Sequence, residues 1–265
     1  MQDLSELGLR LLHSLVGDQP DGLLLVGDAT QRIFTRGYSL KGLGIDIGGR
    51  GIVLRNYRNT RQILEAAFPL VAAEWEDDLV QSGLSVADAH PEFSVREGVK
   101  PIVVRCKDEA AETRFLATEV AALLKYQHYT PGDICVVARN RHFRELAVDA
   151  LRGAGIPVFQ FQTFAMGEVS AEQDAVRVSS LHGAKGHEFG TVFVVGAVDG
   201  VIPQRAAQDA DALTGEAAIL YVGMTRARDL LYLSHSEEDS NHRACKRSSF
   251  IDRIAKAVDE VVYRH

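Results

Sequence analysis

Short apolar runs alternate with longer helical stretches between residues 101 and 234, and this alternation constrains the fold more than any other feature. The expected strands span residues 101–106, 133–138, 157–161, 175–180, 191–198 and 229–234. The expected helices span residues 109–126, 142–152 and 215–227, followed by a closing helix at 248–262. Strands that alternate with helices are typical of βαβ units. The sequence therefore predicts an α/β fold with a parallel sheet flanked by helices.

The first hundred residues are less regular. Leucines at helical spacing predict a helix over residues 4–16, and the run GLLLVGD predicts a buried strand that ends at Gly27 and Asp28. A second strand is expected at residues 51–54, leading into the helical stretch NYRNTRQILEAAF with Thr60 as its N-cap. Residues 81–100 carry Gly, Pro and Ser, which predicts a surface loop or a boundary between lobes.

Composition limits the class of protein and of partner. The 265 residues are 46% hydrophobic, enough for a full core, and their net charge is -7. Any nucleic-acid contact must therefore come from a local groove rather than from a positive surface overall. The three cysteines form no CxxC motif, which fits a reducing compartment. The amino-terminal stretch is polar and no apolar run reaches the roughly 18 residues of a membrane span, so we expect a cytoplasmic protein with no membrane contact.

The stretch VSSLHGAKGHEF, at residues 178–189, looks at first like a phosphate-binding loop. Gly183 and Gly186 flank Lys185, and an apolar run follows. A phosphate loop needs GxxxxGK[ST], in which backbone N–H groups surround the phosphates and the hydroxyl reaches the metal ion. No part of the chain has that spacing. The stretch is therefore not a phosphate loop.

Four stretches together resemble one family. LLLVGDATQRIF resembles motif III of the UvrD/Rep/PcrA-like superfamily 1 DNA helicases, and LRNYRNTRQIL resembles their motif IV. VSSLHGAKGHEFGTVFV resembles motif V, and ILYVGMTRARDLLYLS resembles motif VI. Each stretch alone would be modest evidence, but the four occur in the family's order and cover most of the chain.

The resemblance implies a RecA-like, P-loop NTPase-like second motor domain at residues 56–265 and a remnant of the first RecA-like domain at residues 1–55. The opening residues Met1 to Asp3 match the end of the family's DExQD motif, so we expect a fragment of a longer helicase. The lysine of the phosphate loop and the carboxylates that hold Mg²⁺ would then lie upstream, with no metal ligand in this chain. Such a fragment would not hydrolyse ATP alone, whereas the whole enzyme would couple ATP hydrolysis to movement along single-stranded DNA and to duplex unwinding, with DNA repair among its expected pathways.

Site residues follow from the resemblance at matching positions. Arg58 and Arg226 would be arginine fingers, because a planar guanidinium binds phosphate oxygens bidentately and stabilises the charge of phosphoryl transfer. Arg228, further along the expected helix, is interpreted as structural. The other expected nucleotide contacts are Gln31 at the γ-phosphate, Tyr57 on the adenine, Glu188 on the ribose, and Gln2, Gly27 and Asp28 beside the nucleotide. Alternatives remain for single residues: a turn for Gln31, core packing for Tyr57, and a helix-start carboxylate for Glu188.

A second set of residues would contact DNA. His182 and Lys185 would touch the phosphate backbone of one strand, and Phe34 would stack on a base. The run Arg139, Asn140, Arg141 and Arg144 could follow a nucleic-acid backbone. Phe34 as a core residue and the basic run as a solvated helix start are the open alternatives.

The sequence departs from the family pattern at several points. The residues after Phe34 lack the usual tryptophan, which weakens the base-stacking role, and the acidic and arginine run before motif VI is reduced to Gly215 to Ala218. Only a short bridge replaces the large 2B insertion before motif V. Two alternative functions remain: a non-motor RecA-like binding or adaptor module, and the motor part of a helicase-nuclease. Oligomeric state is not indicated.

Overall fold

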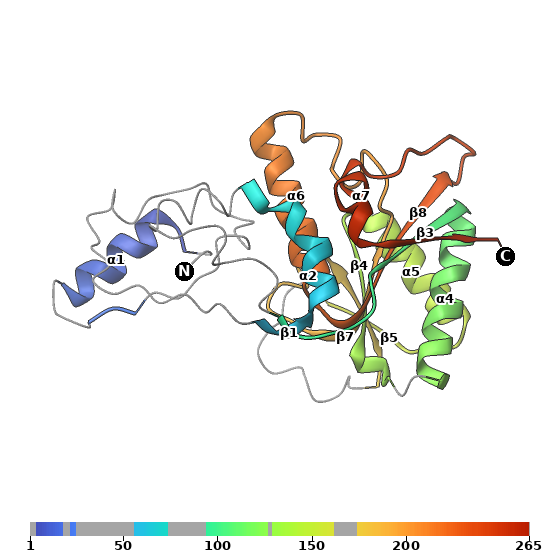
Figure 1. The fold of residues 1–265 in the computed structure, drawn as a ribbon, viewed down its shortest axis with the longest axis horizontal. Helices are drawn as coiled ribbons and strands as arrows, with labels where there is room; N and C mark the ends of the chain where they lie inside the picture. The colour runs from blue at the N-terminus through green and yellow to red at the C-terminus, as the bar shows by residue number, and fades with distance from the viewer. Residues whose placement is uncertain are drawn as a thin grey trace.

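The computed structural model describes residues 4–17, 22–24, 56–73, 94–126, 129–161 and 174–264. Within these ranges, seven strands form one parallel sheet in the order β5-β6-β4-β7-β8-β3-β9 (Figure 1). The strands are β3 (Ile102–Asp108), β4 (Ile134–Ala138), β5 (Val158–Gln160), β6 (Val176–Ser180), β7 (Phe189–Val195), β8 (Ala227–Glu238) and β9 (Asp259–Tyr263). The α/β fold with a parallel sheet, expected from the alternation of runs, is confirmed.

Helices cover both faces of the sheet. The helices α4 (Glu109–Tyr126) and α5 (Arg141–Gly153) pack on one face. The other face is covered by α2 (Arg61–Ala67), α6 (Ala210–Met224), α7 (Ser249–Ile254) and the 3-10 turns η3 (Phe68–Leu70) and η7 (Ala255–Ala257). A further helix, α1 (Glu6–Val16), begins at the N-cap Ser5, and a 3-10 turn, η6 (Pro131–Asp133), leads into β4.

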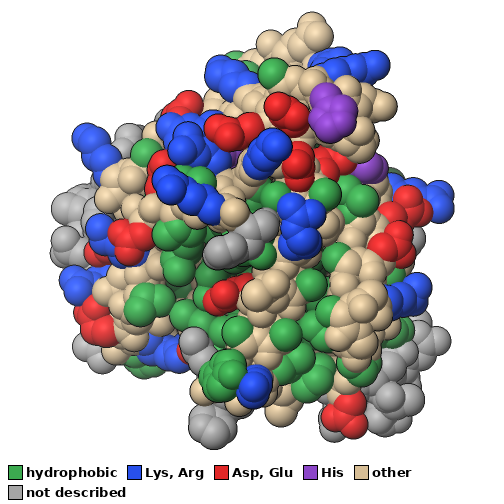
Figure 2. All heavy atoms as spheres, turned by 90° about the vertical axis from the view of Figure 1, so that its right-hand side faces the viewer, with side chains coloured by type: hydrophobic (Ala, Val, Ile, Leu, Met, Phe, Trp, Pro, Cys, Tyr) green, Lys and Arg blue, Asp and Glu red, His purple; other side chains and the backbone are tan. Residues whose placement is uncertain are grey.

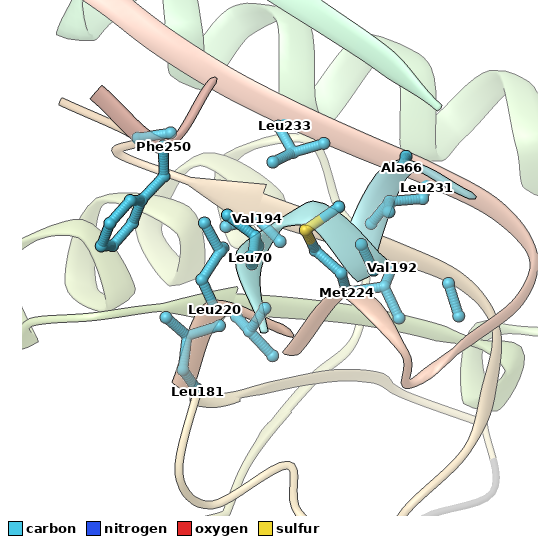
Figure 3. Packing of buried hydrophobic residues seen from close by; sticks show 14 of the residues in the cluster. Ala66, Leu70, Leu181, Val192, Val194, Leu220, Met224, Leu231, Leu233 and Phe250 are labelled. Atoms are coloured by element: carbon cyan, nitrogen blue, oxygen red, sulfur yellow. The ribbon is translucent and has the colours of Figure 1, made fainter. Parts of the chain in front are cut away.

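Strand residues alternate between two hydrophobic clusters. Along β4, Cys135 and Val137 face the side of α2 and α6, whereas Ile134 and Val136 face α4 and α5. Figure 3 shows the first cluster, in which Leu220 and Met224 of α6 pack over residues of β7 and β8. Burial of a Leu or Val side chain contributes about 1.5–3 kcal/mol. Continuous apolar runs in the sequence thus correspond to strands buried on both faces.

A second, smaller sheet pairs β1 (Asn56–Thr60) with β2 (Ser94–Arg96) in parallel. The expected helix does begin after Thr60, which holds the N-cap position, but the residues before it form a strand. The expectation of an irregular segment over residues 81–100 is wrong at β2. Neither strand contains a run of apolar residues. Each is stabilised by pairing with a segment distant in sequence, so the local residue pattern gave no signal for it.

Two further expectations are corrected near the carboxyl terminus. The helix expected at residues 215–227 begins earlier, since the Asp209 carboxylate accepts a hydrogen bond from the Ala212 N–H at 2.7 Å, and it ends at Met224. Arg226 therefore follows the helix and Arg228 lies in β8 rather than further along a helix. The closing helix ends at Ile254, and the β-branched residues after it form β9 against β3.

Strand β7 begins earlier than expected, at Phe189, and ends earlier, at Val195, whereas β8 extends beyond both expected bounds, from Ala227 to Glu238. Among the described residues, no helix combines the length and the apolar character that crossing a membrane requires. The expected boundary between residues 55 and 56 adjoins residues outside the described part, so the division into two domains stays a prediction.

Candidate nucleotide and nucleic-acid site

Three of the expected nucleotide contacts lie together at the amino-terminal edge of the sheet. Strands β7 and β8 begin side by side, with Phe189 opposite Ala227. The Phe189 N–H donates to the Arg226 carbonyl at 2.9 Å, so Glu188 and Arg226 come directly before neighbouring strand starts. Strand β1 adds Arg58, whose guanidinium forms an ion pair with the Glu188 carboxylate. Residues of the three stretches that resemble motifs IV, V and VI thus meet at one edge.

The guanidinium of Arg226 is bound by its own domain. The residue is 2% exposed, and its Nε donates to the Val222 carbonyl at 2.9 Å. Its terminal nitrogens donate to the His187 carbonyl at 3.4 Å and to the Thr225 hydroxyl at 3.3 Å. Three partners of this kind leave the charge buried but hydrogen-bonded, as burial of a charge requires. Contact with a phosphate requires the side chain to turn out of this position.

Arg58 and Tyr57 differ from Arg226 because both are open to solvent. The side chains of Arg58 and Glu188 are 41% and 39% exposed, and Tyr57 is 63% exposed. This exposure is incompatible with core packing of Tyr57, the alternative that the sequence left open. A phenol ring that stands in solvent next to Arg58 in β1 is available for stacking.

Two residues that sequence reasoning missed hold this edge together. Asn59 is 1% exposed, and its Nδ2 donates to the carbonyls of Thr225 at 2.8 Å and of Ala227 at 2.6 Å. From β2, Arg96 donates through Nη1 to the Arg58 carbonyl at 2.5 Å. The sequence carries no signal for either role beyond a polar side chain next to an expected site residue.

The segment 181–188 connects two edges of the sheet. At the carboxyl-terminal edge, the Leu181 N–H donates to the carbonyl of Ala138, the last residue of β4. The segment then crosses the sheet through a series of turns and reaches Glu188 at the opposite edge, with Gly186 at a φ of 87°. A positive φ favours glycine, so Gly186 fits the turn that a bulkier residue would strain. His182 and Lys185 therefore lie on the same short crossover as Glu188.

Burial lowers the pKa of His182, and the nearby Arg139 charge lowers it further, whereas Glu216 raises it. The imidazole is therefore neutral near physiological pH and would bind a DNA phosphate by a hydrogen bond without charge. Lys185 is the cationic member of the pair. Its side chain and that of His182 are partly exposed.

The basic run after β4 does not form one surface. Arg139 makes a bidentate ion pair with Glu216, with Nη2 to Oε1 at 2.6 Å and Nε to Oε2 at 3.0 Å, and the two side chains are 14% and 8% exposed. Asn140 caps α5, because its Oδ1 accepts from the Phe143 N–H at 3.0 Å. Only Arg141 stands in solvent, with a side chain that is 81% exposed and paired to Glu145. This division favours the alternative of a solvated helix start.

Charge on the visible face of the domain is mixed. Figure 2 shows lysines and arginines interspersed with aspartates and glutamates rather than gathered into one positive surface. This agrees with the net charge of -7.

Some expected site residues lie outside the described part of the chain: Gln2, Gly27, Asp28, Gln31 and Phe34. Within the described ranges, no group of three or more His, Cys, Asp or Glu side chains could hold a metal ion.

Comparison with known proteins identifies similar sequences and folds. Residues 165–238 match the family described as the UvrD-like helicase C-terminal domain. DNA helicase II of Escherichia coli is 42% identical over 72 residues, which cover 27% of this chain and 10% of that protein. The ATP-dependent DNA helicase PcrA of Leuconostoc citreum is 38% identical over 93 residues, covering 34% of this chain and 12% of that protein. The matches thus span about a tenth of the length of these relatives.

A solved structure has the same architecture. The C-terminal domain of a possible DNA helicase from Lactobacillus plantarum superposes with a TM-score of 0.53 at 20% identity, covering 79% of this chain and 99% of that domain. At this identity the likeness shows the fold alone. The RecA-like fold and the resemblance to UvrD-like helicases, both expected from the sequence, are confirmed.

Proposed function

We propose that this chain, which is related through residues 165–238 to UvrD-like helicases, is the second motor domain of an ATP-dependent superfamily 1 DNA helicase. In this proposal the complete gene product couples ATP hydrolysis to movement along single-stranded DNA and to duplex unwinding in the cytoplasm. The nucleotide lies between this domain and a first RecA-like domain. DNA and that first domain are the proposed partners.

The observation that carries the proposal is the meeting of Arg58, Glu188 and Arg226 at the amino-terminal edge of β7 and β8. Two guanidinium groups on one edge can bind phosphate oxygens and stabilise the charge that develops during phosphoryl transfer. A carboxylate beside them can accept hydrogen bonds from ribose hydroxyls. The three residues come from separate parts of the chain, and the fold brings them to one place.

The crossover 181–188 supports coupling between nucleotide and DNA. The segment carries His182 near its carboxyl-edge end, Lys185 in its middle and Glu188 at its amino-edge end, and we propose that His182 and Lys185 bind the phosphate backbone. A short segment that carries contacts for both ligands can couple movement at one site to the other. Closure of two motor domains on ATP and their opening after hydrolysis would then shift the DNA contact along the strand.

The residues present fit part of a nucleotide site. The sequence contains no GxxxxGK[ST], and the described residues offer no cluster for Mg²⁺. The proposal therefore assigns the phosphate loop and the magnesium ligands to the first motor domain, and this chain by itself is expected not to hydrolyse ATP. When bound in that domain, Mg²⁺ neutralises charge on the β- and γ-phosphates.

One observation favours the alternative of a non-motor binding module. Arg226 is buried, and its guanidinium is bound to carbonyls of its own domain. In a binding module this arrangement would be permanent, whereas in a motor domain the side chain turns toward the nucleotide when the domains close. Turnover by arginine variants distinguishes the two.

The experiment measures ATP hydrolysis by the complete gene product with and without single-stranded DNA. We expect Arg58→Ala to reduce the DNA-stimulated rate by about 10³-fold or more, as removal of an arginine finger does, while single-strand binding stays near the wild-type level. Normal turnover by Arg58→Ala would overturn the proposal. So would a gene product with neither GxxxxGK[ST] nor a DExQ motif upstream of this segment.

A further inference from the structure

We infer that Asn59 is a positioning residue for Arg226: its buried amide holds the backbone on both sides of the arginine in the place from which the guanidinium reaches the nucleotide. This inference rests on the proposed function, because it assigns a role within the same site. Asn59 is buried, at 1% exposed, and its amide contacts the backbone on either side of Arg226. It acts through the peptide that carries Arg226.

The hydrogen bonds of Asn59 determine the orientation of its amide. Both protons of Nδ2 are directed at carbonyl oxygens, those of Thr225 at 2.8 Å and Ala227 at 2.6 Å. Its Oδ1 accepts from the Nδ2 of Asn56 at 3.2 Å. Because carbonyls only accept hydrogen bonds, a flipped amide would place an acceptor against two acceptors. An amide is therefore the group that this position requires.

The two carbonyls bracket one residue, and that residue is Arg226. Thr225 ends the turn after α6 and Ala227 begins β8, so the clamp fixes the peptide where a helix changes into a strand. The clamp also comes from β1, the strand that carries Arg58. The clamp thus joins the peptide of Arg226 to β1, and a displacement of about 1 Å at such a site can cost 10²-fold in rate.

The neighbouring strand β2 reinforces the same contact. Arg96 donates through Nη1 to the carbonyls of Arg58 at 2.5 Å and Arg228 at 3.2 Å. Its Nη2 binds the Asp229 carboxylate at 2.5 Å. Arg96 therefore joins β1 to β8 further along, whereas Asn59 joins β1 to the two residues adjacent to Arg226.

The test uses the complete gene product in six forms besides the wild type: the single variants Asn59→Asp, Asn59→Ser and Arg226→Ala, the two double variants that combine each Asn59 change with Arg226→Ala, and the control Asn241→Asp. Asp keeps the shape of Asn but places oxygens against the two carbonyls, whereas Ser keeps one donor. Asn241→Asp makes the same chemical change at an exposed loop position. The readouts are kcat and KM for ATP at saturating single-stranded DNA, together with the thermal unfolding midpoint.

We expect Asn59→Asp to lower kcat about 10- to 100-fold and to leave KM within about threefold of the wild-type value, because the lost contact matters in the transition state. Asn59→Ser should fall between wild type and Asn59→Asp, and Asn241→Asp should match the wild type. Each double variant should have the same kcat as Arg226→Ala alone, since a residue that acts through Arg226 has no effect once the guanidinium is gone.

The outcomes separate the two claims. If Arg226→Ala lowers kcat but neither Asn59 variant does, or if the losses multiply in the double variants, Asn59 has at most a structural role and the inference is overturned while the proposed function stands. If Arg226→Ala turns over ATP normally, the proposed function fails and the inference fails with it. Should Asn59→Asp not fold, the kcat of Asn59→Ser, alone and combined with Arg226→Ala, decides in the same way.

Discussion

The Arg58 guanidinium forms an ion pair with the Glu188 carboxylate, which joins strand β1 to the end of the crossover 181–188. Both side chains are substantially exposed, at 41% and 39%. Exposed pairs of this kind contribute only about 0–1 kcal/mol. Under the proposed function, exchange of this contact for a phosphate on Arg58 and a ribose on Glu188 would therefore cost little.

The first prediction concerns Glu188 as the ribose contact. In the complete gene product, Glu188→Ala should raise KM for ATP about tenfold, the value of one hydrogen bond to a charged group, and change kcat much less. Wild-type enzyme should prefer ATP to 2′,3′-dideoxy-ATP, and the variant should not. Steady-state kinetics with both nucleotides, and Glu145→Ala as an exposed acidic control, provide the measurement. A variant that still discriminates between the nucleotides would exclude this role.

A second prediction follows from the buried pair of Arg139 and Glu216. Glu216→Ala leaves the Arg139 charge without its partner at a site that is 14% exposed, so the free energy of unfolding should fall by about 3–5 kcal/mol. Glu145→Ala removes the partner of the exposed Arg141 and should cost less than about 0.5 kcal/mol. Urea unfolding of the 265-residue chain measures both. Equal costs would contradict the structural role of the Arg139 pair.

Stability should depend on pH through Glu112. Burial raises the pKa of this carboxyl, while hydrogen bonds from the Ser234 hydroxyl and the Gly196 N–H only partly oppose the shift. The folded state therefore binds a proton that the unfolded state has released above the ordinary pKa of 4.5. The stabilisation is full below that value and is lost as pH rises through the folded-state pKa.

Glu112→Gln tests this dependence, because glutamine keeps the accepting oxygen and carries no charge. Its stability should fall less than that of the wild type over a urea-unfolding series from about pH 5 to pH 8, since the proton linkage is gone. The two proteins should converge at the acidic end. If the free energies of unfolding of the two proteins changed in parallel with pH, the pH dependence of stability would not come from protonation of Glu112.

The fourth prediction concerns a glycine next to the end of β7. Gly196 has a φ of 71°, and a Cβ there would lie 2.5 Å from the Phe143 ring. Gly196→Ala should therefore lower the free energy of unfolding by about 1–3 kcal/mol, from overpacking and backbone strain. Gly153→Ala meets no neighbouring atom within 4 Å and should be neutral or slightly stabilising. Two similar urea midpoints would refute the argument for Gly196.

Apolar runs and helical spacing in the sequence predicted the strands and helices whose formation depends on residues close together in the chain. The strands and helices between residues 101 and 180 lie close to their expected bounds, because strands covered on both faces carry continuous apolar runs. Strand β9 was expected to be helical, since its pairing with β3 depends on contacts distant in sequence. The end of α6 was also missed, and with it the place of Arg226 outside the helix.

The sequence predicted those residues of the candidate site that lie within the stretches resembling helicase motifs. The resemblance identified Arg58, Glu188 and Arg226, and the fold brings them to one edge. Neither the clamp by Asn59 nor the burial of Arg139 could be inferred, because a polar residue's partner is fixed only by tertiary structure. An arginine bound to a buried glutamate has the same local sequence signal as one that binds DNA.

The central claim is that Arg226 contacts the nucleotide during hydrolysis, and DNA-stimulated ATP turnover by the complete gene product tests it most directly. Arg228 provides the control, because it is close in sequence, its side chain is 42% exposed, and its guanidinium lies 3.6 Å from the Asp133 carboxylate. We predict that Arg226→Ala lowers kcat by about 10³-fold or more with single-strand binding retained, whereas Arg228→Ala stays within about threefold of the wild type. Equal turnover by Arg226→Ala and Arg228→Ala would contradict the account.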